Sequence, residues 1–221
     1  MTGVPIGVGL VALAVISGCS REPEQPPLGA LVEAAARNDA TAVRDLLDRG
    51  ADVNERDPTG RTAVTAAAYA RSPEVVRLLV AAGADVDLQD DTRSNAFLAL
   101  GETGDVAVFE EVLQADPDVT VTNRFGGTAL IPAADRGHVE MVRAFLERTE
   151  VDVDHVNDLG WTALLEAVIL GDGGPAHQQI VRLLLEAGAD RLIGDRDGVT
   201  PLEHARERGY GRIASILEAA Q

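Results

Sequence analysis

The segment LGDGGPAHQQ, residues 170–179, contains the residues of this chain whose types and spacing most suggest chemistry. It brings together Asp172, Gly173, Gly174, Pro175 and His177. A glycine-rich phosphate cradle needs a preceding strand or a helix N-terminal nest, and the pattern before this segment is helical. Asp172 and His177 alone would give a metal ion two ligands, which is too few for a site. The segment therefore remains a candidate contact loop without an evident reaction.

The other reactive side chains are dispersed. His138, His155 and His204 lie in different parts of the chain, and neither His138 nor His204 has a further ligand at metal-binding spacing. No P-loop, dinucleotide fingerprint, Gly-x-Ser-x-Gly or His-Glu-x-x-His motif occurs. We expect no enzymatic activity, no cofactor and no bound metal. The alternative is a small-molecule- or metal-binding envelope stress protein that uses the 171–177 loop.

Composition narrows the class of protein. The 221 residues are 46% hydrophobic and only 3% aromatic, which favours closely packed helices with small aliphatic cores, in one domain or one repeat array. There are 36 acidic and 19 basic residues, so the formal net charge is −17. Such a charge argues against nucleic acid as a partner and against electrostatic adhesion to anionic lipid.

Residues 1–27 differ from the rest of the chain. An uncharged apolar run precedes Arg21 and is too short for a comfortable membrane span. Its end, Ile16-Ser17-Gly18-Cys19, resembles the bacterial lipobox, although the positive n-region side chains of that family are absent. The resemblance implies a signal peptide over 1–18, and a lipidated Cys19 on a proline-rich tether over 19–27. An uncleaved anchor and a buried apolar helix are the alternatives.

The remainder of the chain is repetitive. The phrase GRTAVTAAAYARSPEVVRLLVAAGADVD, which starts at Gly60, returns in variant form from Gly126, Gly160 and Gly198. Its anchor positions recur at a nearly constant step, which lengthens only before the last, and they are Thr62, Asn95, Thr128, Thr162 and Thr200. A further copy without the preceding turn, ALVEAAARNDATAVRDLLDRGADVN, comes before them. Six units therefore span about 28–56, 57–89, 90–122, 123–156, 157–194 and 195–221.

This pattern resembles the ankyrin repeat family, most closely in Thr200-Pro201-Leu202 and in the run from Ile180 to Asp190. The apolar stripe of Val75, Val76, Leu78 and Leu79 agrees, because such a helix pair buries its stripe only by stacking on neighbours. We expect an all-α ankyrin-repeat solenoid over 28–221, with six helix-turn-helix units and β-turn fingers. Gly83 is expected to end its helix in the left-handed conformation.

Two units depart from the repeat. In the third, Arg93 replaces the turn glycine and ADPDV replaces AGADV, so we expect looser stacking there. In the fifth, the step from Thr162 to Ile180 exceeds the equivalent step from Thr62 to Val75 by five positions, so the excess is inserted between the two helices. The insertion is either a partner contact or a tolerated addition.

Aspartates recur in the fingers at 52, 85, 118, 152 and 190. Because they are a whole repeat apart, Asx-turn hydrogen bonding explains them better than calcium binding does.

The resemblance also implies a protein partner, still unidentified, which binds the finger tips and the concave face of the first helices. The residues expected there are Arg56, Arg61, Tyr69, Arg93, Arg124, Phe125, His155, Leu159, Trp161, Glu166 and Arg196. Packing on the neighbouring finger is the alternative role for Trp161. We expect a monomeric scaffold module of the bacterial cell envelope, held by its lipid alone at the outward face of the cytoplasmic membrane or at the outer membrane.

Overall fold

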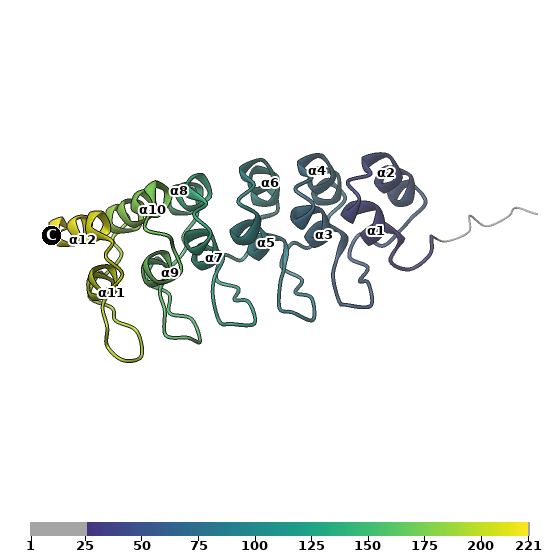
Figure 1. Cartoon of the computed structure of the whole chain (residues 1–221). Coiled ribbons are helices and arrows are strands. Elements are labelled where there is room, and N and C mark those ends of the chain that lie inside the picture. The colour runs from purple at the N-terminus through teal and green to yellow at the C-terminus, as the bar shows by residue number, and fades with distance from the viewer. Residues whose placement is uncertain (1–25, 221) are drawn as a thin grey trace, which may run out of the picture.

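The computed structural model describes residues 26–220 of the chain, and helices in this part alternate between two layers (Figure 1). The inner layer contains α1 Ala30–Ala36, α3 Ala63–Tyr69, α5 Ala96–Thr103, α7 Leu130–Asp135, α9 Ala163–Ile169 and α11 Pro201–Glu207. The outer layer contains α2 Ala40–Asp48, α4 Pro73–Ala81, α6 Val106–Val112, α8 Val139–Arg148, α10 Pro175–Glu186 and α12 Gly211–Ala219, and the short 3-10 turn η1 Leu113–Ala115 extends α6. The predicted all-α solenoid is confirmed.

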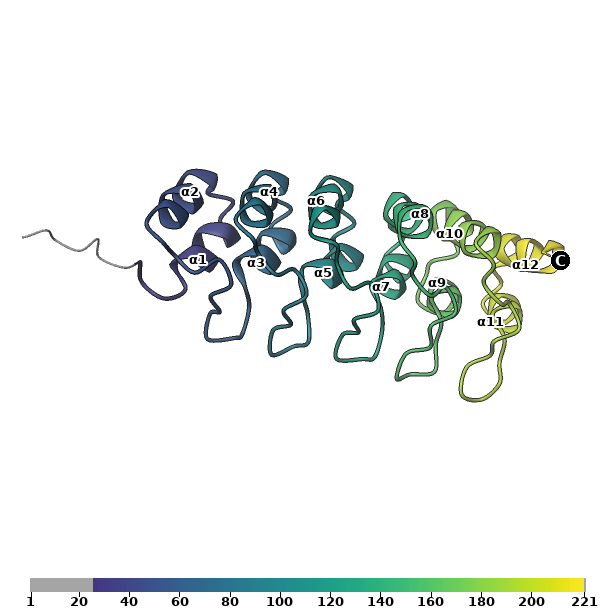
Figure 2. The same ribbon diagram turned by 180° about the vertical axis from the view of Figure 1, so that it is seen from behind.

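Hairpin-like fingers join each outer helix to the next inner helix, and all of them project to the same side of the stack (Figures 1 and 2). The only β-pairing among residues 26–220 is an isolated antiparallel bridge between Arg56 and Thr62. The carboxylates of the predicted finger aspartates each accept the backbone N–H two residues later, over 2.8–3.0 Å, at Asp52, Asp85, Asp118, Asp152 and Asp190. The Asx-turn prediction is confirmed.

The repeated threonine caps the inner helices. The Oγ1 atoms of Thr62 and Thr162 accept the N–H three residues later, and the side chain of Asn95 does the same in the third unit. Thr200 adds a capping box with Glu203. In the fourth unit the helix begins later, at Leu130, and the buried Thr128 Oγ1 has no hydrogen-bond partner.

Small residues in the inner layer let neighbouring units approach closely. Ala67 and Ala68 on α3 are fully buried, as are Val75, Val76 and Leu79 on α4. The tightest approach involves Gly101 on α5, where a Cβ atom would lie 2.2 Å from the carbonyl oxygen of Ala129. Stacking of successive units thus builds one continuous core.

Three aromatic side chains fill the interface between the third and fourth units. They are Phe97 on the inner helix α5, Phe109 on the outer helix α6 and Phe145 on the outer helix α8, all almost completely buried. The ring centroids of Phe97 and Phe145 are 5.2 Å apart, and those of Phe109 and Phe145 are 5.5 Å apart. Figures 1 and 2 show α6 and α8 more widely separated than α4 and α6. The three rings account for this, because aromatic side chains replace the small aliphatic ones used elsewhere.

The substituted turn positions of the third unit keep the glycine-like backbone. Arg93 has φ 58° and Asp116 has φ 51°, whereas the equivalent Gly60 and Gly83 have φ 76° and 88°. The left-handed conformation predicted for Gly83 is therefore confirmed. A side chain in this conformation costs about 1–2 kcal/mol per residue. The looser stacking expected for residues 90–122 stays a prediction, with this strain as its physical basis.

Replacing both residues by glycine, Arg93→Gly with Asp116→Gly, should raise the free energy of unfolding by about 1–2 kcal/mol, since relief of strain exceeds the added backbone entropy. Urea denaturation measures the gain, and hydrogen exchange over residues 90–122 should slow. Arg93→Ala is the control, because it removes the side chain but keeps the strained backbone. An equal gain from this control would contradict the explanation.

The predicted signal peptide and Cys19 lie outside the described residues, as does most of the tether. Within residues 26–220 no helix has both the length and the apolar character needed to cross a bilayer.

Candidate functional site

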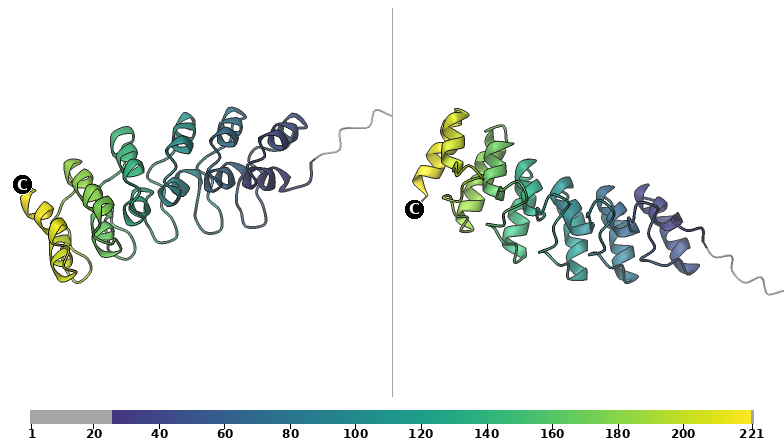
Figure 3. Two further views of the ribbon diagram at one scale, coloured as in Figure 1. Left: turned by 45° about the horizontal axis from the view of Figure 1, so that its top comes forward. Right: turned by 90° about the horizontal axis from the view of Figure 1, so that it is seen from below.

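A groove runs along the side of the stack on which the inner helices meet the fingers. It consists of two adjoining hollows of about 700 and 590 Å³, which share Glu102, Asn123 and Phe125. The larger hollow is completed by Gly127, Ile131, Pro132, Asp135, Arg136, Asn157, Leu159, Glu166 and Leu170, and the smaller by Tyr69, Thr92, Ser94, Leu98 and Arg124. We call the two together the inner groove. The view from below in Figure 3 shows the face along which it runs.

Five of the predicted partner-binding residues line the inner groove. They are Tyr69, Arg124, Phe125, Leu159 and Glu166. The Arg124 guanidinium lies over the Phe125 ring, 4.8 Å from its centroid, and the Tyr69 hydroxyl is 2.8 Å from Ser94 Oγ. Units two to five thus bring these residues onto one surface.

The other six lie outside the lining, and several contact neighbouring parts of the chain. Arg56 donates to the Gln89 carbonyl of the next finger over 2.9 Å, and Arg196 donates to the Asp158 carbonyl of the preceding finger. His155 Nε2 is 2.6 Å from the Gly126 carbonyl oxygen. Their side chains join adjacent fingers, which gives them a structural role that sequence reasoning missed.

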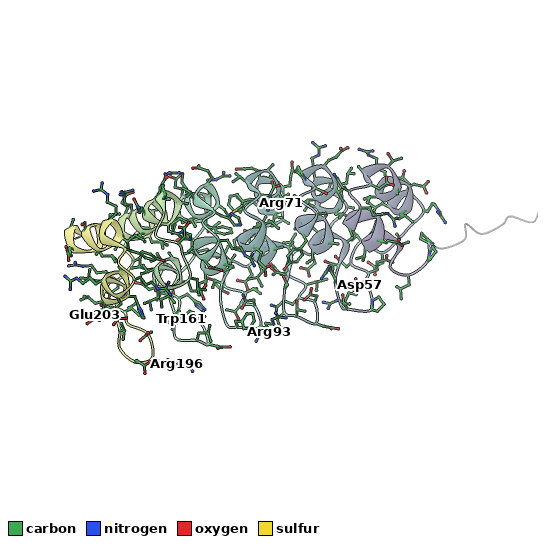
Figure 4. The ribbon with its side chains drawn as sticks, in the orientation of Figure 1. Asp57, Arg71, Arg93, Trp161, Arg196 and Glu203 are labelled. Carbon is green, nitrogen blue, oxygen red and sulfur yellow. The ribbon has the colours of Figure 1, made fainter. Side chains whose placement is uncertain are left out.

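Arg61, Arg93 and Trp161 complete this set. Arg61 lies over the Tyr69 ring at 5.5 Å, and Arg93 donates to Thr122 Oγ1 over 3.4 Å. Trp161 is half-buried, and its backbone N–H donates to Asn157 Oδ1. Figure 4 places Arg196 at the tip of the last finger and Trp161 nearer the helices.

Large apolar side chains are exposed along the groove. Phe125, Leu159 and Leu170 have 51%, 47% and 51% of their surfaces accessible, and all three line the larger hollow. Single exposed apolar residues are ordinary, but a group of them around a hollow is typical of interaction sites.

Glu166 is the most perturbed ionisable group of the groove. It is only 7% exposed, and its Oε1 accepts a hydrogen bond from Asn157 Nδ2 over 2.8 Å. Burial, together with the nearby negative charge of Asp135, raises the pKa of Glu166 to about 7, against the weaker opposing effect of the Asn157 bond. The carboxyl group therefore changes charge near neutral pH.

Sequence reasoning missed much of the lining, although the repeat register could have found it. Glu166 follows Thr162 by four residues, and Tyr69 follows Thr62 by seven. The same offsets from Thr128 give Pro132 and Asp135, both of which line the groove. An offset of eight gives Arg136 and Leu170, which line it too.

The five-residue insertion is shared between a loop and a helix, so its prediction as a loop is wrong for Pro175 and His177. The loop comprises residues 170–174, two residues more than the 70–72 loop, and α10 has 12 residues where α4 has nine. Proline at the first helical position favours this early start, because its fixed φ suits the helix and its missing N–H needs no partner there. Asp172, Gly173 and Gly174 remain in the loop.

His177 takes over a contact made elsewhere by His138. His138 follows Thr128 by ten residues and places Nε2 3.1 Å from the Glu102 carbonyl oxygen of the preceding unit. His177 Nε2 lies 2.9 Å from the equivalent carbonyl oxygen, that of Asp135. Its Nδ1 is 2.8 Å from Asp172 Oδ1, and no cluster of three or more His, Cys, Asp or Glu able to hold a metal occurs in residues 26–220. His177, held by Asp172, therefore joins the fifth unit to the fourth.

Deletion of residues 172–176 should leave the fold intact. The shortened chain places His177 directly after Gly171, as His138 follows Gly137, so the histidine falls in the ordinary register. We expect the thermal midpoint to stay within about 4 °C of the parent value, equivalent to roughly 1 kcal/mol. His177→Ala in the full chain is the comparison and should lower stability by about 1–2 kcal/mol, since it removes a buried side chain together with its hydrogen bonds to Asp172 and to the Asp135 carbonyl oxygen. If the deletion variant is unfolded, the assignment of His177 to the repeat position of His138 is wrong.

Known proteins with similar sequence or structure share this architecture. A family model described as ankyrin repeats (three copies) matches residues 9–90 and 96–195. The Escherichia coli ankyrin repeat protein YahD is 44% identical over 187 residues, which cover 85% of this chain and 93% of YahD. A solved ankyrin repeat domain from Acinetobacter baumannii has a TM-score of 0.82 and 46% identity, and the match covers 87% of this chain and 97% of that one. Another solved ankyrin repeat protein has a TM-score of 0.84 and 38% identity, covering 89% of this chain and all of the other.

Proposed function

The chain belongs to the ankyrin repeat family, and from this membership we propose that it is a protein-binding scaffold tethered to the bacterial cell envelope. Ankyrin repeats form protein-interaction modules, and proteins built from them are generally non-enzymatic scaffolds. The inner groove is the proposed binding surface.

The grouping of exposed apolar residues around the larger hollow is the observation that carries this proposal. Phe125 and Leu159 come from successive fingers and Leu170 from the end of α9, so a partner segment lying in the groove would contact all three. Aromatic and apolar anchors that enter such hollows dominate binding energy in protein interfaces.

Photo-crosslinking in the native host tests the surface. A photoreactive amino acid at Phe125 or Leu159 should capture a partner protein, whereas the same amino acid at the exposed outer-layer positions Arg77 or Glu186 should not. Phe125→Ala combined with Leu159→Ala should reduce capture by a reporter at Leu170 at least tenfold. Equal capture from outer and groove positions would contradict the assignment.

The envelope tether rests on Ile16-Ser17-Gly18-Cys19 and on the polar, proline-rich stretch that follows. Diacylglycerol on Cys19, with or without a further acyl chain, would hold the chain stably, because a single chain alone binds only marginally. Labelled palmitate should enter the parent protein and not Cys19→Ala. Globomycin should cause an unprocessed precursor to accumulate. Absence of label from the parent protein would remove the tether and leave the groove proposal untouched.

A further inference from the structure

Glu166 presents a carboxyl group to the inner groove with one oxygen uncommitted. Within residues 26–220, Asn157 is the only hydrogen-bond partner of the Glu166 side chain, and this bond uses Oε1, so Oε2 accepts no donor from the described protein. The residue is 7% exposed and lines the larger hollow. Glu166 Oε2 is not among the buried side-chain atoms of the described residues that lack a partner, so it is open to the solvent of the groove, where a charged donor on a bound ligand can reach it.

Charges along the larger hollow favour a cation. Its ionisable residues are Glu102, Asp135, Arg136 and Glu166. Arg136 lies 3.6 Å from a Glu102 oxygen and so offsets the negative charge of Glu102. Glu102 is the acidic residue of the hollow that lies furthest along the stack from Glu166. Asp135 adds negative charge beside Glu166. Since the whole chain carries a formal charge of −17, a cationic partner is also attracted from a distance.

The apolar lining favours arginine among the cations. Ile131 and Pro132 form part of the wall, and Phe125, Leu159 and Leu170 contribute exposed apolar surface. A guanidinium group is more weakly hydrated than an ammonium group, and its planar donors match a carboxylate. The apolar side chains would cover the methylene stem of the arginine and the residues on either side of it.

On this basis we propose that the inner groove recognises an extended partner segment with an arginine between apolar residues, whose guanidinium binds the Glu166 carboxylate. This inference rests on the proposed function and specifies its ligand.

Binding of this kind should depend on pH. Glu166 must be ionised, and its pKa of about 7 leaves about a tenth of it ionised at pH 6 and about nine tenths at pH 8. Binding should therefore strengthen up to about tenfold over this range. Three elements pack against α9, and their ionisable groups are Asp135 on α7 with Arg136 directly after it, His177, Arg182 and Glu186 on α10, and Glu203, His204, Arg206 and Glu207 on α11. Asp135 is the one whose charge shifts the Glu166 pKa.

A display library of random twelve-residue peptides, selected at pH 8 on the full chain in detergent, provides the test. Arginine flanked by apolar residues should be enriched. A synthetic peptide from the selection should bind at least tenfold more weakly when its arginine is replaced by citrulline, a neutral isostere. Glu166→Gln should lose a similar factor and also the pH dependence, whereas the exposed control Glu186→Gln should retain both.

Enrichment without arginine, unchanged binding by Glu166→Gln, or failure to select any peptide would overturn the inference. Crosslinking of a native partner from Phe125 is a separate measurement. If that crosslink persists while the peptide result is negative, the groove binds protein by other chemistry and the proposed function stands. If the groove crosslinks are absent, the proposed function itself fails.

Discussion

Replacement of Phe145 by alanine is expected to lower the free energy of unfolding by about 3–5 kcal/mol, the cost typical of emptying a buried aromatic site. The Phe145 side chain is completely buried, and its ring contacts both Phe97 and Phe109 across the interface between the third and fourth units. These aromatic pairs contribute beyond the area that they bury.

The position of Phe145 within the array adds a second expected effect. Each unit of a repeat stack contacts only its neighbours, so stability is close to a sum of unit and interface contributions. Weakening this one interface should uncouple residues 26–122 from residues 123–220. Urea unfolding followed separately by hydrogen exchange in the two halves should then show two midpoints where the parent protein shows one.

Two matched variants control for loss of an aromatic side chain in general. Phe145→Leu retains much of the volume and should cost less than about 2 kcal/mol. Phe125→Ala removes a ring that is 51% exposed and should change stability by no more than about 0.5 kcal/mol. A single cooperative transition for Phe145→Ala, with a loss below about 1 kcal/mol, would show that the phenylalanine cluster does not join the halves.

The second large effect concerns Glu166→Gln and depends on pH. The folded-state pKa of Glu166 is raised to about 7 from an ordinary value of 4.5, so between these values the folded state binds more protons at this position than the unfolded state does. The contribution of Glu166 to stability is therefore most favourable below pH 4.5 and falls as the pH rises through 7. Glutamine stays neutral, and its side-chain oxygen can still accept the Asn157 hydrogen bond.

The variant should consequently match the parent protein near pH 4.5 and exceed its stability by roughly 2–3 kcal/mol at pH 8. Other carboxyl groups, including those of Asp90 and Asp195, have lowered pKa values. They stabilise the fold above their unfolded pKa and lose this contribution as the pH falls, which is the opposite pH dependence to that of Glu166. The measured quantity is therefore the difference between variant and parent at each pH, in which these contributions cancel. Glu186→Gln, at an exposed position, should show a flat difference. If the stability difference between Glu166→Gln and the parent protein is also independent of pH, the Glu166 carboxylate is not buried in the folded state.

Local features of the fold could be predicted from the sequence because they depend on residues close together in the chain. The Asx turns at the finger aspartates and the left-handed Gly83, which were predicted, involve contacts within a few residues. The Thr62 and Thr162 caps, which were not predicted, are equally local. Recurrence of this local pattern at a nearly constant step was sufficient to identify six stacked helix pairs.

The candidate site depended on contacts between units, which local pattern does not encode. Arg56 and Arg196 are exposed finger residues by sequence, yet both donate to carbonyl groups of neighbouring fingers. Glutamate is usually a surface residue, so the sequence does not predict a buried carboxyl group at Glu166. This side chain becomes buried only because α7 and the finger that carries Asn157 pack around it.

The insertion shows the same division. From the sequence alone, five additional residues lay between two helices, with an aspartate and a histidine suggestive of a ligand site. Tertiary structure divided them between a slightly longer loop and an extended α10 that starts at Pro175, and His177 within this helix contacts the Asp135 carbonyl of the preceding unit. Periodicity thus determined the repeat architecture, while the packing of one unit on the next decided which polar side chains join units and which remain open to a partner.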